Sequence, residues 1–366
     1  MGTTTIPFGD PKAVKRWSTN LAVDARKKSY FETRFIDSSD NAVIQKKTEL
    51  ESDAGDRISF DLVVQMRNKP TYGDSKLEGK QENLTFFTDE VVIDQVRHAV
   101  SAGGRMHRKR TEHDLRSVAR GRLGDYFAQL VDEYFFIYLS GARGINEDFI
   151  ESTQFTGFAK NPIQEPDGDH LIYGGAATSK GTLTAADTMT RKVVERALNL
   201  AKMMQARNPQ NANMVPVNVE SAENYVVLMS PDSAFDLRVS DANGWLDIHR
   251  ALTSAVGKNT PIFMGGLGMI GGAVLHEHRS AIRFNDYGAG ANVPASRALL
   301  LGRQAGVVAY GTTGGLRYSW TEKMLDLDNE PIVSSGFLGG IKKTRFNNRD
   351  FGVISIDVAA ANPNAQ

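Results

Sequence analysis

Residues 57–66 read Arg-Ile-Ser-Phe-Asp-Leu-Val-Val-Gln-Met, and an apolar side chain occupies every second position. The alternating set is Ile58, Phe60, Leu62, Val64 and Met66. Because side chains of a β-strand alternate between its faces, this period of two predicts a strand with one apolar face. A second β-rich run follows at 84–93, Leu-Thr-Phe-Phe-Thr-Asp-Glu-Val-Val-Ile. Together the two runs predict a β-hairpin.

The connection between these runs is a polar stretch of 17 residues, 67–83. Its charged residues are Arg67, Lys69, Lys76 and Lys80 against Asp74, Glu78 and Glu82. Structureless loops of this length are uncommon in compact domains, which favours a projecting tip over an ordinary hairpin inside a sheet. Ten strand residues at ~3.3 Å each would carry the tip ~33 Å from the body. A two-stranded ribbon is marginally stable alone, so its apolar face is expected to rest on another surface.

A long helix is predicted over 111–142, because apolar residues recur there at spacings of three and four. Thr111 with Asp114 forms a weak capping box, and Gly141 supplies a stop signal. About 30 residues at ~1.5 Å each make a rod of ~45 Å. The acidic pair Asp132 and Glu133 is expected on its surface. The apolar set is Leu115, Val118, Leu123, Phe127, Leu130, Val131, Tyr134 and Tyr138.

A basic stretch begins just before this helix. Residues 105–122 hold seven Lys or Arg and two acidic residues in a chain whose 43 basic and 43 acidic residues balance. Acidic groups of a neighbouring copy, phosphate, or solvent alone could face this charge. The balanced total disfavours a dedicated nucleic-acid binder and does not oppose dense packing of identical copies.

Residues 1–50 are predicted to be an arm that adds little to a core, because apolar residues are sparse and basic clusters occur around Arg16 and Lys28. A frayed terminus is the alternative. With 366 residues the chain is expected to form two lobes. In the second half, a helix is predicted over 190–207, further helix over 243–256, and strands at 225–229 and 352–358.

Motifs for chemistry are weak. The absence of cysteine excludes disulfides and thiolate nucleophiles. The glycine-rich loop 265–272 contains GxGxxG, and Asp286 lies at a suitable distance for a dinucleotide site, but the required βαβ unit is not evident. His276-Glu277-His278 resembles a metal clip without a third ligand, and an exposed polar strand is favoured there. No cofactor, metal, catalytic residue or membrane span is expected.

The order of a basic arm, a long hairpin, a long helix and a mixed lobe resembles the major capsid proteins of tailed bacteriophages with the Hong Kong 97-like fold, in their podovirus-type family. The resembling stretches cover the first 145 residues. They include Ile6-Pro7-Phe8-Gly9, Lys15-Arg16-Trp17, Lys28-Ser29-Tyr30-Phe31, Leu84-Thr85-Phe86-Phe87-Thr88-Asp89, 93–100, Arg110-Thr111 and Asp114-Leu115-Arg116.

The resemblance implies an α+β fold with five segments. These are an N-terminal arm at 1–50, an extended hairpin (E-loop) at 51–104, a peripheral domain at 105–210 with a spine helix at 110–141, an axial domain at 211–310, and a return to the peripheral domain at 311–366.

The resemblance also implies self-assembly through pentamers and hexamers into an icosahedral head around double-stranded DNA, assembled in the host cytoplasm. A separate scaffolding protein, a portal, non-specific contact with packaged DNA and a decoration protein are the expected partners. A nicotinamide-dependent enzyme using 265–272 and a bacterial nanocompartment shell protein are the alternatives. Contacts between subunits are expected at Arg16, Arg67, Lys69, Asp74, Lys76, Glu78, Lys80, Arg108, Lys109 and Arg110.

Overall fold

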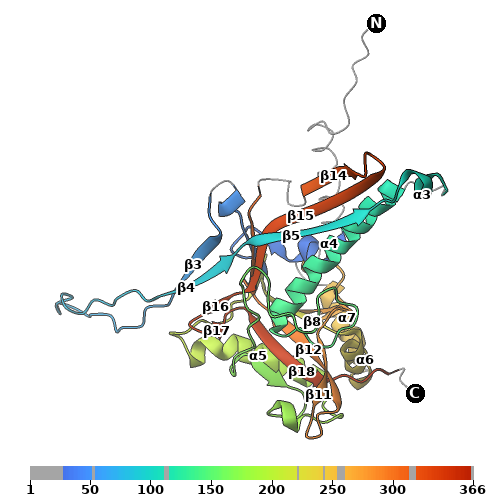
Figure 1. Ribbon diagram of the computed structural model, residues 1–366. Helices are drawn as coiled ribbons and strands as arrows, with labels where there is room; N and C mark the ends of the chain where they lie inside the picture. Colours follow the sequence, from blue (N-terminus) through green and yellow to red (C-terminus); the bar gives the residue numbers. More distant parts are fainter. Residues whose placement is uncertain are drawn as a thin grey trace.

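The computed structural model describes residues 28–51, 54–110, 115–220, 222–241, 244–253, 260–312 and 319–363. Arg16 and the expected capping box at 111–114 lie outside these residues. Within them, two β-sheets form the body of the molecule, and the long helix α4 (Leu115–Ser140) runs beside both (Figure 1). A separate two-stranded hairpin leaves the body on one side.

The first sheet has six strands and carries the hairpin and the start of α4. Its strands are β1 (Ile36–Asp37), β2 (Ile44–Lys47), β13 (Gly306–Tyr310), β15 (Glu330–Lys343), β14 (Ser319–Leu325) and β5 (Asp94–Ser101). The 14-residue β15 organises this sheet, since it pairs with β13 and β14 along one edge and with β5 along the other. The ring of His98 in β5 stacks on Tyr126 of α4 at 4.2 Å, which fixes the helix to this sheet.

The second sheet has eight strands and lies below the first in Figure 1. They are β6 (Leu171–Tyr173), β18 (Val353–Ala359), β12 (Val293–Leu301), β8 (Ala222–Met229), β10 (Ala273–Glu277) and β9 (Gly268–Ile270), with β7 (Val217–Val219) beside β8 and β11 (Arg283–Tyr287) beside β12. Val226 and Leu228 share a core with α4, whereas Tyr225 and Val227 share one with α5 (Arg191–Arg207). A strand covered on both faces explains the continuous apolar run at 225–229.

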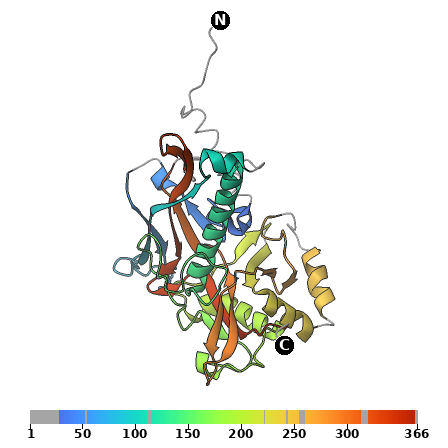
Figure 2. The same ribbon diagram turned by 45° about the vertical axis from the view of Figure 1, so that its right-hand side comes forward.

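The remaining elements are short. They are α2 (Tyr30–Arg34), α3 (Arg105–Lys109), α6 (Pro231–Ser240), α7 (Trp245–Thr253), the 3₁₀ turns η1 (Glu49–Glu51) and η2 (Lys180–Thr182), and the two-residue strands β16 (Arg345–Phe346) and β17 (Arg349–Asp350). Turned by 45°, the molecule shows α6 and α7 on the outside of the eight-stranded sheet, away from the six-stranded sheet (Figure 2).

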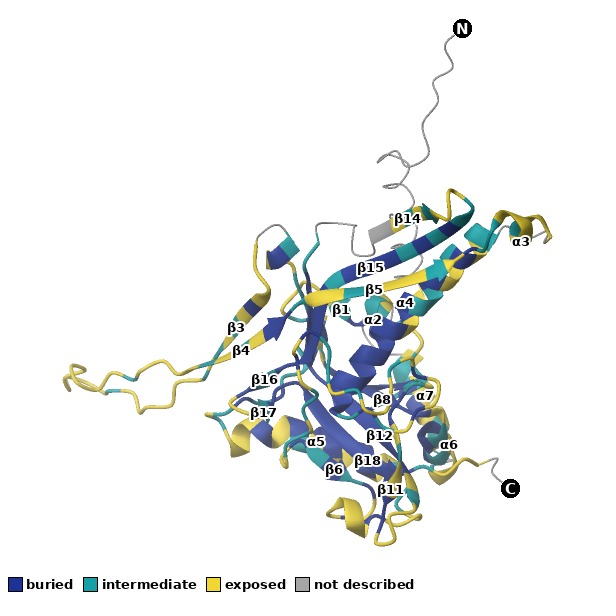
Figure 3. Ribbon diagram, viewed as in Figure 1, coloured by how far each residue is buried: buried dark blue, intermediate teal, exposed yellow. Residues whose placement is uncertain are grey.

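The predicted hairpin is confirmed. It consists of β3 (Arg57–Val63) and β4 (Phe86–Val92), paired from Arg57↔Val92 to Val63↔Phe86. Residues 64–85 continue outward as an irregular loop that reaches away from the body (Figure 3). Nearly all of this loop is exposed.

Both long predicted helices are also confirmed, with changes at their ends. The basic residues 105–109 form the separate helix α3, and α4 is described from Leu115. Only the second half of α4 is buried all round, and Val118 is 50% exposed. In α5 the predicted buried face is confirmed in full: Val193, Val194, Ala197, Leu198, Ala201 and Met204.

Three expectations were wrong. The first concerned Asp132 and Glu133, which are buried, with 8% and 1% of their surfaces exposed. The second concerned residues 28–50, the described part of the expected arm. Phe31, Phe35 and Ile44 are core residues that pack with both sheets and α4.

The third concerned His276, which was expected in an exposed strand. It lies in β10 with only 1% of its surface exposed. The glycine-rich loop also lacks the helix that a dinucleotide site needs. β9 turns through Gly271 and Gly272, both with positive φ, into the antiparallel β10. A tight glycine turn therefore explains this motif.

The two sheets do not follow the expected domain boundaries at 210 and 310. β6 and α5, from the segment 105–210, belong to the eight-stranded sheet and its cover. β18, from the segment 311–366, lies between β6 and β12 in that same sheet. β13, from the segment 211–310, lies instead in the six-stranded sheet. The chain therefore crosses between the two sheets more often than the expected segments allow.

Candidate assembly surfaces

The apolar face of the hairpin rests on the chain's own body. Ile58 and Val91 pack with Leu50 and Val307 at the base of the hairpin. Further out, the rings of Phe60 and Phe346 meet edge to face at 5.9 Å. As far as Leu62, the alternating apolar side chains of β3 therefore pack on the body of their own subunit. Leu62 itself packs against the cluster around Phe346. Beyond Leu62, Gln65 accepts a hydrogen bond of 2.9 Å from Gln205 of α5, and most of the loop that follows is exposed.

A buried carboxylate fastens the hairpin to the six-stranded sheet. Asp89 of β4 forms an ion pair with Lys342 of β15, and their side chains are 9% and 10% exposed. Its other oxygen accepts a hydrogen bond of 3.0 Å from the backbone N–H of Arg345. Lys342 also donates to the backbone oxygen of Glu90 at 3.0 Å. A buried pair with these additional hydrogen bonds positions the hairpin specifically.

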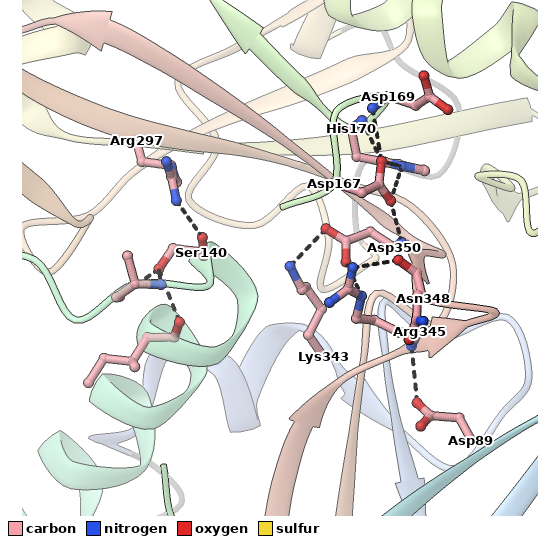
Figure 4. A network of polar contacts seen from close by, with 12 residues as sticks. Asp89, Ser140, Asp167, Asp169, His170, Arg297, Lys343, Arg345, Asn348 and Asp350 are labelled. Atoms are coloured by element: carbon pink, nitrogen blue, oxygen red, sulfur yellow. Dashed lines mark hydrogen bonds and ion pairs between the residues drawn. The ribbon is translucent and has the colours of Figure 1, made fainter. Parts of the chain in front are cut away.

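Asp89 lies at the edge of a larger polar network (Figure 4). At its centre, Asp350 of β17 accepts from Lys343 Nζ at 2.7 Å and pairs with Arg345 Nε at 3.0 Å. The backbone N–H of Asp350 donates to Asp167 at 2.7 Å, and the carboxylate of Asp167 contacts His170 Nδ1 at 2.8 Å. Burial lowers the pKa of Lys343 and raises that of Asp350, and each is partly restored by the opposite charge.

This network joins the hairpin, the end of β15 and the loop that leads into β6. A second buried ion pair ties the eight-stranded sheet to α4. Arg297 of β12 contacts Asp357 of β18 at 2.6 Å. It also donates to the backbone oxygen of Ser140 at 2.8 Å (Figure 4). Since Ser140 ends α4, the guanidinium satisfies a carbonyl at the helix C-terminus, where a cation is favoured. Both sheets are thus held to common elements by buried charge.

The neck of the hairpin tip is clamped by Glu82. Its carboxylate accepts hydrogen bonds from the backbone N–H groups of Arg67 and Asn68, at distances of 2.7 to 2.9 Å. These bonds lower the pKa of Glu82. Beyond the neck, the tip is exposed, and within the described chain five charged side chains have no hydrogen-bond or ion-pair partner: Lys69, Asp74, Lys76, Glu78 and Lys80.

The basic stretch is partly engaged within the chain. Arg105 donates from Nη2 to the backbone oxygen of Asp328 at 3.2 Å, and Arg108 donates to that of Asn329 at 3.2 Å. Arg116 pairs with Glu322 of β14. The expected partners of this charge were a neighbouring copy, phosphate or solvent, whereas Arg105 and Arg108 bind a turn of their own chain. Lys109 and Arg110 are exposed.

The acidic pair of α4 anchors distant segments of the chain. Asp132 accepts from Ser29 Oγ at 2.7 Å and from the N–H groups of Tyr30 and Phe31 at 2.8 and 3.1 Å. Burial raises the pKa of Asp132 to about 6. Glu133 accepts from the N–H groups of residues 150 and 151, at 2.7 and 2.8 Å. The sequence contains one sign that these acids are buried, because both of them interrupt the apolar run at 130–139.

The two histidines of β10 and the residues after it belong to an aromatic cluster. The Nε2–H group of His276 donates to the backbone oxygen of Ile262 at 2.8 Å. The ring of His278 stacks on Phe136 at 4.9 Å and lies 4.6 Å from Tyr30. Burial lowers the pKa of both histidines to about 4. The ring of His276 is buried and that of His278 is half-buried, and both pack on aromatic side chains.

The described residues hold no cluster of three or more histidine, aspartate or glutamate side chains that could bind a metal ion. In the same part of the chain, no helix has the length and apolar character needed to cross a membrane.

Comparisons with known proteins agree over most of the chain. A family model described as phage capsid protein matches residues 5–362. The major capsid protein of Pseudomonas phage KPP25 is 28% identical over 371 residues, with 94% of each chain covered. Among solved structures, the capsid of Ralstonia phage GP4 is 66% identical, with a TM-score of 0.89 and all of both chains covered. The cyanophage Pam1 capsid has the same fold, with a TM-score of 0.70 at 22% identity over 89% of this chain and 91% of that one.

Proposed function

Because this chain belongs to the phage capsid protein family, and is a major capsid protein that assembles with itself into the icosahedral capsid of a bacteriophage, we propose that the β3–β4 hairpin fastens each copy to a neighbour. Its α+β fold matches that of phage capsid structures and is consistent with the Hong Kong 97-like fold. The observation that carries the proposal is the exposed distal hairpin, whose large apolar side chains are each more than half exposed in their own subunit.

The exposed side chains lie on the outer strand ends and along the loop. They are Val63 (52%), Phe86 (54%), Leu84 (55%), Met66 (60%), Leu77 (64%) and Tyr72 (78%). Fully burying one large apolar side chain contributes about 1.5–3 kcal/mol. Covering three of these side chains would contribute about 4.5–9 kcal/mol at most, since each is already partly buried. A neighbouring copy is the surface that a shell supplies at every such site.

The charged tip would then set the position of the contact. Lys69, Lys76 and Lys80 are proposed to meet carboxylates of the neighbour, and Asp74 and Glu78 to meet its cations. Charge pairs at the rim of an interface contribute more to specificity and association rate than to affinity. Arg67, Arg16, Arg108, Lys109 and Arg110 complete the proposed contact residues, although Arg108 is already engaged with the turn at 326–329.

We further propose that the six-stranded sheet with α4 forms the peripheral domain, and that the eight-stranded sheet with α5, α6 and α7 forms the axial domain. The segment 51–104 is the E-loop in this scheme, and the arm is reduced to the part of 1–50 that precedes α2. Shared buried anchors such as Arg297 would let both domains move as one unit.

The remaining expectations extend this proposal. Assembly through pentamers and hexamers in the host cytoplasm, a scaffolding protein, a portal and non-specific contact with packaged double-stranded DNA follow from the role of a major capsid protein. A decoration protein is a further candidate partner. The capsid family is a structural one, and the matches do not favour the nicotinamide-dependent enzyme or the nanocompartment shell.

The hairpin is tested by replacing residues 69–81 with Asn-Gly, which keeps the clamp between Glu82 and the N–H groups of 67 and 68. The variant is produced together with the head proteins of its own phage and imaged by negative-stain microscopy. We expect folded subunits with the wild-type circular dichroism spectrum and no closed shells. A control replaces Lys69, Lys76 and Lys80 by Arg, which preserves charge and should preserve shells. Normal shells from the shortened hairpin would contradict the proposal.

A further inference from the structure

We propose that a cavity beside α2 binds phosphate groups of packaged double-stranded DNA. The cavity has a volume of about 800 Å³ and lies between residues 28–34, the middle of α4 and residues 278–280, which follow β10. Figure 3 shows α2 beside α4, to which the backbone of residues 30 and 31 is hydrogen-bonded. This inference rests on the contact with packaged DNA proposed above, and it does not depend on the role proposed for the hairpin.

Four cationic side chains line this cavity: Lys28, Arg34, Arg122 and Arg279. They come from three segments that are far apart in the chain, so only the fold brings them together. Burial, followed by the charges of Arg279 and Arg34, lowers the pKa of His278, which indicates that both guanidinium groups lie near this ring. At neutral pH the ring itself is uncharged, and the positive charge of the cavity comes from the four longer side chains.

The carboxylates of the cavity leave part of this charge uncompensated. Asp125 is shared between Lys28 and Arg122, at 2.5 and 3.6 Å. Asp132 is engaged by the hydrogen bonds from residues 29–31. Two acids against four cations leave an excess of two positive charges in the lining. Clefts lined by charge of one sign concentrate ions of the opposite sign, so this cavity attracts anions.

Two of the arginines have no carboxylate partner within the described chain. Arg279 is exposed and makes no hydrogen bond or ion pair there. Arg34 donates from Nε to the backbone oxygen of Met264 at 3.2 Å, and its guanidinium lies 4.6 Å from the centre of the Tyr30 ring. These contacts orient Arg34 without neutralising it. A guanidinium that is already oriented loses less conformational entropy when it binds an anion.

The composition of the lining favours phosphate over the carboxylates of a protein. The core of a protein–protein contact contains large apolar side chains, and none of the large apolar side chains that the structure exposes lines this cavity. Protein–DNA interfaces are polar and positively charged, and guanidinium groups bind phosphate oxygens through paired hydrogen bonds. The uncharged polar residues of the lining are Ser29, Thr33, Gln129 and Ser280.

The contact made by one subunit is weak. An excess of two positive charges neutralises about two phosphates, and each such contact contributes roughly eightfold in affinity at 0.1 M salt, or roughly 60-fold for both. Many copies that face the same DNA act together, although each contact alone dissociates readily. The site recognises the charged backbone, which is the same in every sequence, and therefore suits DNA of any sequence.

A matched pair of arginine variants tests the site on unassembled subunits. The probe is a fluorescent duplex of about 20 base pairs, followed by anisotropy between about 0.03 and 0.2 M salt. We expect Arg279→Gln to bind roughly eightfold more weakly at 0.1 M salt and to lower the slope of log affinity against log salt by about 0.9. Arg207→Gln removes the same charge from an exposed residue of α5 that also has no partner in the described chain, and it should change neither quantity. Equal weakening by the two variants, or no binding by the wild type at the lowest salt, would overturn the proposal.

Two further measurements separate this site from an assembly contact. Arg279→Gln should form closed shells like the wild type, whereas missing shells together with unchanged duplex binding would overturn the proposal. The shortened hairpin should bind the duplex like the wild type, so failure of the hairpin proposal is distinguishable from failure of this one. Polyglutamate should displace the duplex poorly. Tighter binding of polyglutamate than of the duplex, with the same loss in Arg279→Gln, would assign the cavity to a protein instead.

The occupant inside a head can be identified directly. Since the native chain has no cysteine, Ser280→Cys accepts a single photoreactive group at the cavity. Illumination of DNA-filled heads should crosslink this thiol to DNA. Crosslinks to protein alone would refute DNA as the occupant.

Discussion

Replacing Asp89 by Asn should release the hairpin from the body without unfolding the rest of the chain. The substitution removes the charge that pairs with Lys342, whose side chain is 10% exposed. Removing one partner of a buried ion pair costs about 3–5 kcal/mol, because the other charge stays buried without compensation. Lys342 keeps its hydrogen bond to the backbone oxygen of Glu90, so we expect the lower end of this range, about 3 kcal/mol.

Native-state hydrogen exchange measures this loss where it occurs. A drop of about 3 kcal/mol in opening free energy accelerates exchange by roughly 100-fold. The amides of β3 and β4 should show this increase, while those of β8 and β12 should exchange at their former rates. Adding Lys342→Met to Asp89→Asn removes the uncompensated charge and should restore most of the protection.

The neighbouring residue provides a matched control. Glu90 pairs with Arg57 at 3.3 Å, but both side chains are about half exposed, at 50% and 55%. Exposed pairs contribute about 0–1 kcal/mol, so Glu90→Gln should change exchange in the hairpin by less than about fivefold. Equal effects of the two substitutions, or faster exchange throughout the molecule in Asp89→Asn, would refute the assignment of Asp89 as the local anchor.

Three further outcomes follow from buried groups. The pKa values of His276 and His278 are lowered to about 4, so the stability of the fold decreases as the pH falls from 6.5 toward 4, because the unfolded chain binds these protons first. Chemical denaturation of unassembled subunits should show a loss of roughly 3 kcal/mol per imidazole at most. Asp132, whose pKa is raised to about 6, partly offsets this loss. Asp132→Ala leaves one hydroxyl and two N–H groups without an acceptor and should lower the free energy of unfolding by about 3 kcal/mol, measured at pH 7.5. Gly340→Ala would place a Cβ 2.0 Å from the backbone oxygen of Val92 and should lower the yield of soluble subunits and accelerate exchange at the base of β4.

The hairpin and the two long helices could be predicted from the sequence because their signals are local. A period of two over ten residues identifies β3, and the spacing of Val193, Ala197 and Ala201 identifies the buried face of α5. Each pattern is complete within one element, and the element's own geometry determines which side chains share a face. The same holds for the turn at Gly271, where the residue type itself indicates the conformation.

The support under the hairpin could not be predicted, because its partners are distant in the chain. The periodicity shows that Phe60 and Leu62 share an apolar face, but not that Phe346 and Phe351 lie beneath them. The sequence-based interpretation assigned this face to another molecule, and the structure places most of it against the same subunit.

Burial of charge was the other source of error. Asp132 and Glu133 were expected on the surface because acidic residues are usually exposed, yet each accepts hydrogen bonds from backbone groups of another segment. The turn that receives Arg105 likewise begins more than 200 residues later in the chain. The burial of an acid can be predicted locally only where the helix around it is apolar on every side, since such a helix is itself buried.

The division of the hairpin into a supported base and a free distal part bears on how a shell of this chain closes. Since Ile58, Phe60 and Leu62 are already used within the subunit, a neighbour gains only the distal side chains and the tip charges, so one hairpin contact is weak. Weak contacts dissociate readily when misplaced, whereas several contacts made by the same subunit act together through a high effective concentration. On this reasoning, loss of the hairpin contact should reduce closed shells much more than it reduces the association of two isolated subunits.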